Sequence, residues 1–159
     1  MLKEMSLENQ AATLGESFVT ALTTQQFETV EALFAPQIRF RALVPSRVCE
    51  GQTAGEAVAW LQRWFGSADE VQVLQSTAQQ VFDRLYVSYR LRLHDVINGW
   101  RVIEQHAYGS VQDDRIADLW LLCSGFRPDD EGLTAGPTQC DFVPGIKDDR
   151  SFVADSECG

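Results

Sequence analysis

The segment WRVIEQHAYGSVQDDRIADLWLLCSG, residues 100–125, predicts two long strands joined by a tight turn. Apolar and polar residues alternate on both sides of Asp113-Asp114, and Asp is tolerated at turn positions that need positive φ. A two-residue turn there pairs Gln112 with Arg115. Counting back from that pair, Tyr108 faces Leu119, His106 faces Leu121 and Glu104 faces Cys123.

A second turn signal, Asn98-Gly99, precedes this segment and predicts a further hairpin, in which Ile97 pairs with Trp100. The same counting pairs Tyr89 with Tyr108, Leu91 with His106, and Leu93 with Glu104. Because side chains alternate between the faces of a strand, one face then carries three rows, Tyr89–Tyr108–Leu119, Leu91–His106–Leu121 and Leu93–Glu104–Cys123. Two titratable residues in the middle of an apolar face predict a pocket.

Length and charge restrict the class of protein. The chain has 159 residues, 45% of them hydrophobic, which suits one domain with a sizeable core. Its net charge is −10, with only two lysines and no basic stripe, which argues against binding to nucleic acid or to anionic membranes. With no signal-like start and no run near the ~18 apolar residues of a spanning helix, we expect a cytoplasmic protein.

The rest of the chain predicts helices before strands. Apolar residues at helical spacing predict a helix over 7–23 with Ser6 as N-cap, and a shorter one from Phe27 that Pro36 stops. Ile38 to Leu43 predicts a strand ended by Pro45, and the capping box Thr53-Ala-Gly-Glu56 opens a third helix that Gly66 closes. Strands at about 70–80, 85–97, 100–112 and 115–125 complete an α+β domain, and their length predicts a bulge.

This pattern ends near residue 128. We therefore expect a domain over 1–128 and an acidic tail containing Gly and Pro over 129–159, where 8 acidic residues face 2 basic ones. The tail is expected to be removable without unfolding the domain, unless its few apolar residues cover the cavity mouth or a neighbouring subunit.

The four cysteines, at 49, 123, 140 and 158, have no metal-type spacing. Free thiols are expected in a reducing cytosol, with a Cys140–Cys158 bridge as the alternative. Glu104 and His106 could supply two metal ligands but no third is evident, so we expect neither a metal nor another cofactor.

The order of elements, LFA at 33–35, and V-x-D-D-R-I before the last strand together resemble a nuclear transport factor 2-like domain. The nearest branch is the SnoaL-like group of polyketide cyclases, and the resemblance covers residues 7–128. It implies a cone-shaped, cystatin-like fold: three N-terminal helices on a curved, mostly antiparallel sheet. The cavity of this fold hosts isomerases, cyclases, dehydratases, hydrolases and binding modules.

Ketosteroid isomerase, a member of the same superfamily, can be compared residue by residue. Its catalytic tyrosine falls at Phe18, its proton-abstracting aspartate at Ala42, and its second acid at His106. Two of these three groups are lost, so the resemblance does not imply steroid isomerisation by that mechanism.

Glu104 and His106 are the candidate catalytic residues. Two positions apart on one strand face, their Cβ atoms lie roughly 6.5–7 Å apart, so the side chains can share a hydrogen bond and pass a proton at neutral pH. His106 would be the general acid or base and Glu104 its partner, with no cofactor. The alternative is a structural pair in a non-catalytic binding or dimerisation module.

Other side chains of the same cavity are candidate ligand contacts. They are apolar or aromatic, which suits a small apolar or cyclic ligand, and comprise Phe18, Phe40, Trp60, Trp64, Tyr89, Leu91, Tyr108, Leu119, Leu121 and Cys123. Cys123 is expected to be a buried apolar residue more than a nucleophile, and Arg41 a solvated arginine more than a ligand for an acidic group.

The outer face of the sheet is expected to form a homodimer. The same pairing places Arg90–Ala107–Trp120 and Arg92–Gln105–Leu122 in rows there, extended by Ile103. Trp120, Leu122 and Ile103 would form an apolar patch with a polar rim, which is typical of a protein interface.

Overall fold

A computed structural model describes residues 2–129, with side chains described from residue 10 onward. Residues Met1–Arg127 form one compact unit. Apart from Asp129, the predicted tail 129–159, with Cys140 and Cys158, lies outside the described residues.

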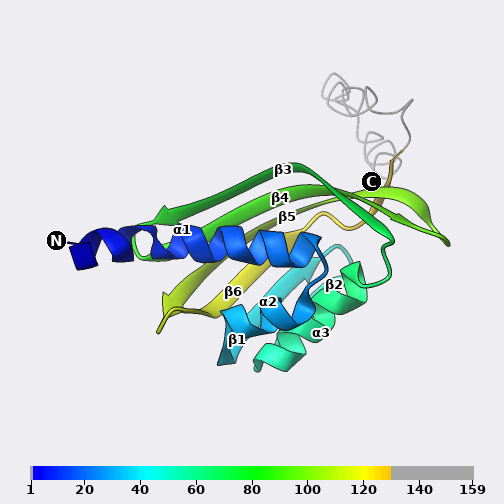
Figure 1. Ribbon diagram of the computed structural model, residues 1–159. Helices are drawn as coiled ribbons and strands as arrows, with labels where there is room; N and C mark the ends of the chain where they lie inside the picture. Colours follow the sequence, from blue (N-terminus) through cyan, green and yellow to red (C-terminus); the bar gives the residue numbers. More distant parts are fainter. Residues whose placement is uncertain (1, 130–159) are drawn as a thin grey trace, which may run out of the picture. The chain divides into compact units, whose positions relative to one another are not determined.

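Three helices and six strands form this unit, and their order is the predicted one with one addition (Figure 1). The elements are α1 (Leu2–Thr23), α2 (Phe27–Leu33), β1 (Phe34–Val44), β2 (Arg47–Gly51), α3 (Ala54–Phe65), β3 (Glu70–Val81), β4 (Arg84–Asp95), β5 (Gly99–Gln112) and β6 (Arg115–Cys123). A two-residue strand, β7 (Arg127–Pro128), follows. The predicted α+β class is confirmed.

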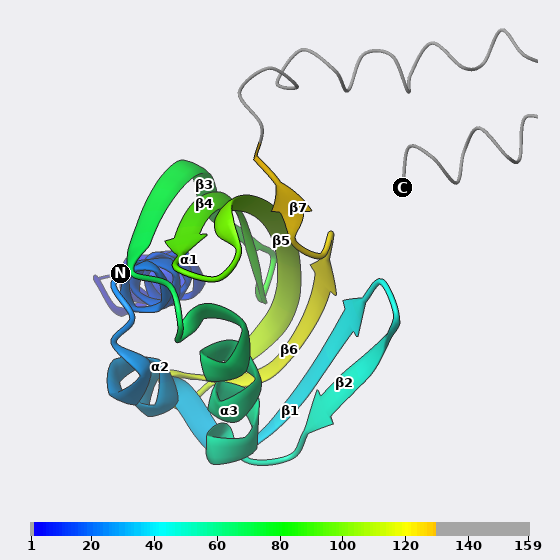
Figure 2. The same cartoon turned by 90° about the vertical axis from the view of Figure 1, so that its right-hand side faces the viewer.

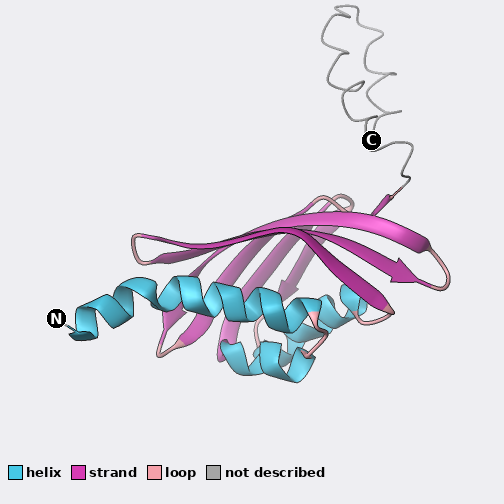
Figure 3. Ribbon diagram, turned by 45° about the horizontal axis from the view of Figure 1, so that its top comes forward, coloured by secondary structure: helices cyan, strands magenta, loops and turns pink. Residues whose placement is uncertain are grey.

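The strands follow the order β2-β1-β6-β5-β4-β3 across one sheet. Every neighbouring pair is antiparallel except β1 and β6, which are parallel. The sheet curves strongly, as Figure 2 shows for β5 and β6. All three helices lie on its concave side, and no helix of the described chain covers the outer face (Figure 3).

Local sequence explains the helix ends in part. Thr53 caps α3 by accepting a hydrogen bond from the Glu56 backbone N–H at 3.1 Å, as predicted. The Glu56 carboxylate accepts from the backbone N–H of Gln52 at 2.8 Å and not from that of Thr53. Ser6 is not an N-cap, because α1 already begins at Leu2.

Strand β2 was not predicted. Pro45 ends β1 as predicted, but Pro45 and Ser46 also form a turn that returns the chain along β1, where Leu43 pairs with Val48. A proline can occupy a turn because its fixed φ suits the position and its missing N–H is not needed there.

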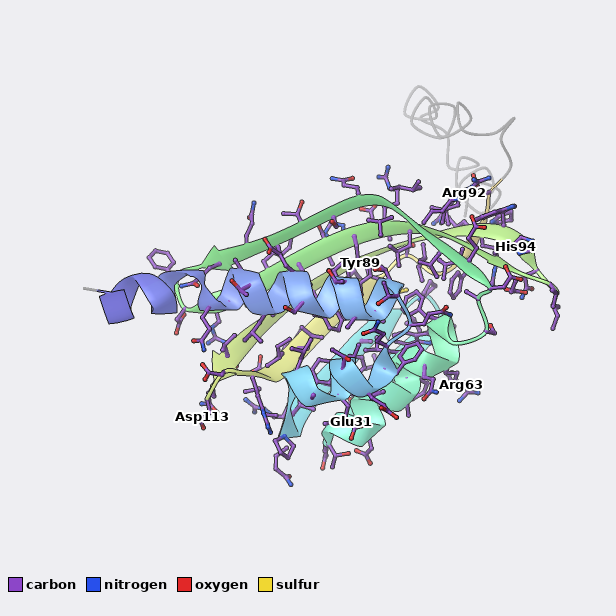
Figure 4. The ribbon with its side chains drawn as sticks, viewed as in Figure 1. Glu31, Arg63, Tyr89, Arg92, His94 and Asp113 are labelled. Atoms are coloured by element: carbon purple, nitrogen blue, oxygen red, sulfur yellow. The ribbon has the colours of Figure 1, made fainter. Side chains whose placement is uncertain are left out.

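The core lies between the helices and the concave face of the sheet. Phe18 of α1 is fully buried, with its ring centroid 5.9 Å from that of Phe34 and 6.3 Å from that of Tyr89. Tyr89, labelled in Figure 4, belongs to β4, so this aromatic group packs the longest helix against the strand next to the β3 edge of the sheet.

Candidate functional site

Glu104 and His106 form the predicted hydrogen bond, with His106 Nε2 lying 2.7 Å from Glu104 Oε2. Two further bonds extend the pair: Arg90 Nε donates to Glu104 Oε1 at 2.8 Å, and Tyr86 Oη lies 2.9 Å from His106 Nδ1. The hydrogen bonds from His106 and Arg90 hold the pKa of Glu104 below its ordinary range, although partial burial opposes them. The carboxylate is therefore ionised at neutral pH.

The predicted place of this pair is wrong. Glu104 and His106 lie on the outer face of the sheet and not in the concave cavity, because their side chains alternate with the buried Ile103, Gln105 and Ala107. The His106 side chain is 42% exposed and that of Glu104 36%. Tyr108, expected in the cavity, also lies on the outer face and is 46% exposed.

The first cause of the error is the turn between β4 and β5. Asp95 pairs with Gly99, so the loop has three residues instead of two, and Tyr89 pairs with Gln105 instead of Tyr108. The offset is odd, and an odd offset exchanges the two faces of a strand. The Asp95 carboxylate accepts hydrogen bonds from the backbone N–H groups of Ile97 and Asn98, while Gly99 takes a φ of +71° that favours glycine.

The second cause is a bulge in β6, where Ala117 is the extra residue between Ile116 and Asp118, which pair with the consecutive residues Val111 and Ser110. The turn at Asp113-Asp114 has positive φ at both residues and pairs Gln112 with Arg115, as predicted. The register then shifts between Ser110 and Val111, so that Gln105 and not Glu104 lies opposite Cys123. A Cβ at Gly109 would come within 2.1 Å of the Asp118 carbonyl oxygen, which explains why a glycine stands beside the bulge. A bulge is thus present as predicted, and its position decides which β5 side chains face the core.

These shifts invert only β5. Strands β4 and β6 keep the predicted faces: Tyr89, Leu91, Leu119, Leu121 and Cys123 are all buried beneath the helices. Phe18 and Phe40 join them there, while Trp60 and Trp64 are partly buried at the edge of the core. The interior thus holds the predicted ligand contacts except Tyr108.

Gln105 is the polar residue that the sequence interpretation missed. It is fully buried, and its Oε1 accepts a hydrogen bond from the Tyr89 hydroxyl at 2.5 Å. Its Nε2 donates to the Cys123 sulfur at 3.2 Å, and the Gly125 backbone N–H donates to the same sulfur at 3.3 Å. The sequence signal for the observed three-residue turn, and so for a buried Gln105, was Asp95 ahead of Asn98-Gly99. Asp is favoured at the first position of a type I turn.

The buried hydrogen bonds between Tyr89, Gln105 and Cys123 have a fixed donor-to-acceptor order. Burial, with a smaller contribution from Cys123, raises the pKa of the Tyr89 hydroxyl, which therefore stays protonated and acts as a donor. The amide of Gln105 does not titrate. The Tyr89 and Gln105 side chains therefore offer hydrogen bonds and do not transfer a proton at neutral pH.

A cavity of about 200 Å³ lies at the end of this chain of groups, with Cys123 among its lining residues. Ile103 and Cys123 line it from the sheet, Trp64 from α3, and Ser46 and Arg47 from the turn and start of β2. Phe126, also in the lining, packs between the Phe65 ring and the Arg101 guanidinium, at 6.2 and 4.1 Å. The cavity is mostly apolar, with a cation and a hydroxyl among its polar groups.

Trp60 and Trp64 lie one turn apart on α3, with ring centroids 6.0 Å apart. Trp60 donates through Nε1 to the Glu50 carbonyl at 3.0 Å, and its ring lies 5.2 Å from the Arg47 guanidinium. These contacts hold the arginine near the cavity that Trp64 lines.

A larger groove lies on the outer face. Its volume is about 480 Å³, and its lining includes Leu43, Val48, Trp120 and Leu122 together with Tyr86, His106 and Tyr108. The four apolar side chains are between 45% and 55% exposed. Arg41 lies at this groove, where its guanidinium is 5.5 Å from the Trp120 ring centroid and pairs with Glu50 at 3.3 Å.

Within the described part of the chain, no three His, Cys, Asp or Glu side chains are placed to hold a metal ion. Cys49 and Cys123 are free and buried. None of the described helices is both long and apolar enough to cross a membrane; the cytoplasmic location remains a prediction.

The fold is that of a helix-covered, strongly curved sheet, and solved structures share it. A proposed polyketide cyclase from Xanthomonas campestris matches at a TM-score of 0.60 and 18% identity, over 74% of this chain and 92% of that one. An LEH-like epoxide hydrolase from M. tuberculosis matches at 0.57 and 16%, over 74% and 84%. A proposed ketosteroid isomerase from Kribbella flavida matches at 0.56 and 16%, over 80% and 87%.

The chain therefore has the nuclear transport factor 2-like fold, and the predicted resemblance is confirmed at the level of the fold. No family model matches the chain, and no curated protein matches it. Because proteins of several activities share this fold, the chemistry has to be argued from the sites themselves.

Proposed function

We propose that the protein binds a small, mostly apolar molecule in the cavity lined by Trp64, Ile103, Cys123 and Phe126. The buried polar chain Tyr89–Gln105–Cys123, which ends at this cavity, carries the proposal. Buried polar groups cost free energy unless each of them is hydrogen-bonded. Here the Cys123 sulfur already accepts hydrogen bonds from two N–H groups. Its S–H is left as a weak donor to a ligand oxygen.

The size of the cavity supports a ligand of about one ring. Cavities of roughly 150 Å³ lined by apolar side chains hold a benzene molecule, and this one is about 200 Å³. Arg47 and Ser46 in the lining suit a ligand with an oxygen acceptor. The neighbours named as a proposed cyclase, an epoxide hydrolase and a proposed isomerase fit a role in ligand binding.

This proposal does not include catalysis by Glu104 and His106 in the concave cavity, since both lie on the other face of the sheet. The concave site is a binding site in which the chain orients a molecule through hydrogen bonds.

Protection of a thiol tests the concave site. The protein is treated with iodoacetamide with and without single-ring ketones and phenols, and modification of each cysteine is followed by peptide mass mapping. A bound molecule should slow the alkylation of Cys123 and leave Cys49 unchanged, because Cys49 is buried elsewhere, on β2. Ile103→Phe, which fills the cavity, should abolish the protection.

If no compound protects Cys123 over Cys49, or if Ile103→Phe leaves the protection intact, the concave site is not a ligand site of this kind.

A second candidate role is that of a dimerisation module, through the apolar half of the outer groove. Leu43, Val48, Trp120 and Leu122 come from β1, β2 and β6 and are about half exposed, so they form a contiguous apolar patch. Ile103, predicted in this patch, is 1% exposed and belongs to the core instead. The part contributed by β2 was not predicted, because β2 itself was not.

Sedimentation of the wild type and Trp120→Glu tests this second role. A charge in the patch should dissociate a dimer. Phe82→Glu is the matched control, because Phe82 is 93% exposed in the turn between β3 and β4. A wild type that remains monomeric at micromolar concentration excludes the dimer.

A further inference from the structure

Three side chains on the outer face form a carboxylate–imidazole–phenol series. Glu104 Oε2 lies 2.7 Å from His106 Nε2, and His106 Nδ1 lies 2.9 Å from Tyr86 Oη. Glu104 and His106 lie on β5 and Tyr86 on β4, two neighbouring interior strands of the sheet. Each group therefore stands on a rigid element.

The order of the protons follows from the neighbours of Glu104. Its carboxylate accepts from Arg90 Nε on one oxygen and is ionised, so the other oxygen requires a donor from His106. In the neutral imidazole Nε2 then carries the proton and Nδ1 accepts from the Tyr86 hydroxyl. In hydroxyl–imidazole–carboxylate triads of hydrolases the imidazole takes a proton from the hydroxyl and the carboxylate orients the imidazole. The same three kinds of group are arranged here in the same order, with the Tyr86 phenol as the hydroxyl.

The groove brings this series to an apolar surface. Tyr86 and His106 both line it, beside Tyr108, Trp120 and Leu122. Tyr86 pairs with Tyr108 and Tyr108 with Trp120, which places three aromatic side chains in one row across the sheet. A flat apolar molecule lying along this row would have its edge at the Tyr86 hydroxyl.

We propose that Tyr86 is the proton-transferring residue of a second site, in which the outer groove binds a small, flat, mostly apolar ketone with a weakly acidic C–H beside its carbonyl. Tyr86 Oη takes the proton from this carbon while its own proton passes to His106 Nδ1, which leaves an enolate and an imidazolium. Glu104 stabilises the imidazolium through the Nε2–H bond. Return of the proton to the same or another carbon restores all three residues, and no oxidant or reductant is needed.

The second site does not rest on the concave one, because its residues lie on the opposite face. A dimer through the apolar half of the groove would compete with this site, because Trp120 belongs both to that half and to the aromatic row on which the ligand would lie.

Deuterium exchange into 2-tetralone, a flat bicyclic ketone, tests the proposal. The ketone is incubated in D₂O with wild-type protein, and the loss of its C–H signals is followed by proton NMR. Exchange should exceed the buffer rate, and Tyr86→Phe should lower the protein-dependent rate by ~100-fold or more, since general acid–base groups contribute about 10²–10⁴-fold. His106→Gln, which replaces the basic ring nitrogen at the other end of the same bond with an amide that cannot take up the proton, should give a similar loss.

Glu104 is a positioning residue in this scheme, and its variant has its own readout. Glu104→Gln should lower the rate by at least about tenfold, because a neutral amide cannot stabilise the imidazolium. Glu104→Asp should recover part of that loss, which a merely structural role would not require. Arg84→Gln is the matched control: it lies on the same strand as Tyr86 and contacts only Asp83 among the ion pairs of the described chain.

Two outcomes overturn the proposal. A wild-type rate equal to that of buffer would favour a second copy of the chain as the occupant of the groove. Exchange that persists in folded Tyr86→Phe and His106→Gln proteins would assign the catalysis to another group.

Discussion

Tyr86 and Tyr89 lie three positions apart on β4, and they differ in almost every property that decides chemistry. Tyr89 points into the core, is 1% exposed and donates to a neutral amide. Tyr86 lies on the outer face, is half-buried and bonds to an imidazole that is itself bonded to a carboxylate. Burial keeps the first hydroxyl protonated, whereas the second has a path along which its proton can leave.

The comparison extends to the two faces of the whole sheet. The concave face is packed and offers fixed hydrogen bonds, which suits binding and orientation. The outer face offers charges, the half-exposed Glu104–His106–Tyr86 series and an open apolar groove. The Glu104–His106–Tyr86 series and the buried Tyr89–Gln105 pair thus lie on opposite faces of one sheet.

The largest expected effect comes from two adjacent leucines of β6 that lie on opposite faces. Leu121 is 3% exposed and Leu122 55%. Leu121→Ala should lower the free energy of unfolding by ~2–5 kcal/mol, because it leaves a cavity in the core. Leu122→Ala, measured at a concentration too low for dimers, should change it by less than ~1 kcal/mol. Urea unfolding of both variants measures the difference, and equal losses would contradict the assignment of faces.

An intermediate effect is expected from Gln105. Gln105→Leu leaves the Tyr89 hydroxyl buried without an acceptor and should cost about 1–3 kcal/mol of unfolding free energy. Adding Tyr89→Phe should restore part of this loss, since the double variant no longer buries an unpaired hydroxyl. Chemical unfolding of the two single variants and the double variant gives the coupling. Additive losses would mean that the two side chains do not depend on each other.

Much of the fold could be predicted from the sequence, because its signals are local. The capping box at Thr53 and Glu56, the positive-φ turn at Asp113-Asp114 and the alternation in β4 and β6 each involve residues close along the chain. Strand β2 was missed because Pro45 was interpreted only as the end of β1 and not as part of a hairpin turn.

The candidate site could not be predicted in the same way, because it depends on register. Whether Glu104 or Gln105 faces the core is decided by the Asp95 carboxylate at one end of β5 and by the bulge beside Gly109 at the other. The extra residue of the bulge is Ala117 on β6, so the register depends on a residue of the neighbouring strand. Alternation alone cannot decide between two faces when the strand carries apolar residues on both.

The smallest expected effect concerns acid and the outer face. Because hydrogen bonds from His106 and Arg90 lower the pKa of Glu104 in the folded protein, the unfolded chain binds more protons as the pH falls through ~4. The stabilisation is therefore present above the ordinary pKa of a glutamate and is lost as the pH falls through the lowered value. Glu104 is about a third exposed, so solvent screens this contribution and at neutral pH Glu104→Gln should cost less than ~1 kcal/mol.

The pH dependence separates this contribution from that of other carboxylates. Between pH 5 and pH 3 the wild type should lose more unfolding free energy than Glu104→Gln, so that the two denaturant midpoints converge in acid. Asp83→Asn is the control for the loss of one charge, because the Asp83 side chain is 89% exposed and its Arg84 partner lies 3.8 Å away. Its midpoint should stay parallel to that of the wild type. If the Glu104→Gln midpoint also stays parallel, the carboxylate is not held by His106 and Arg90 in solution. The order of protons proposed for Tyr86 and His106 would then lack the ionised, hydrogen-bonded Glu104 on which it depends. The buried hydrogen bond between Tyr89 and Gln105 would be unaffected.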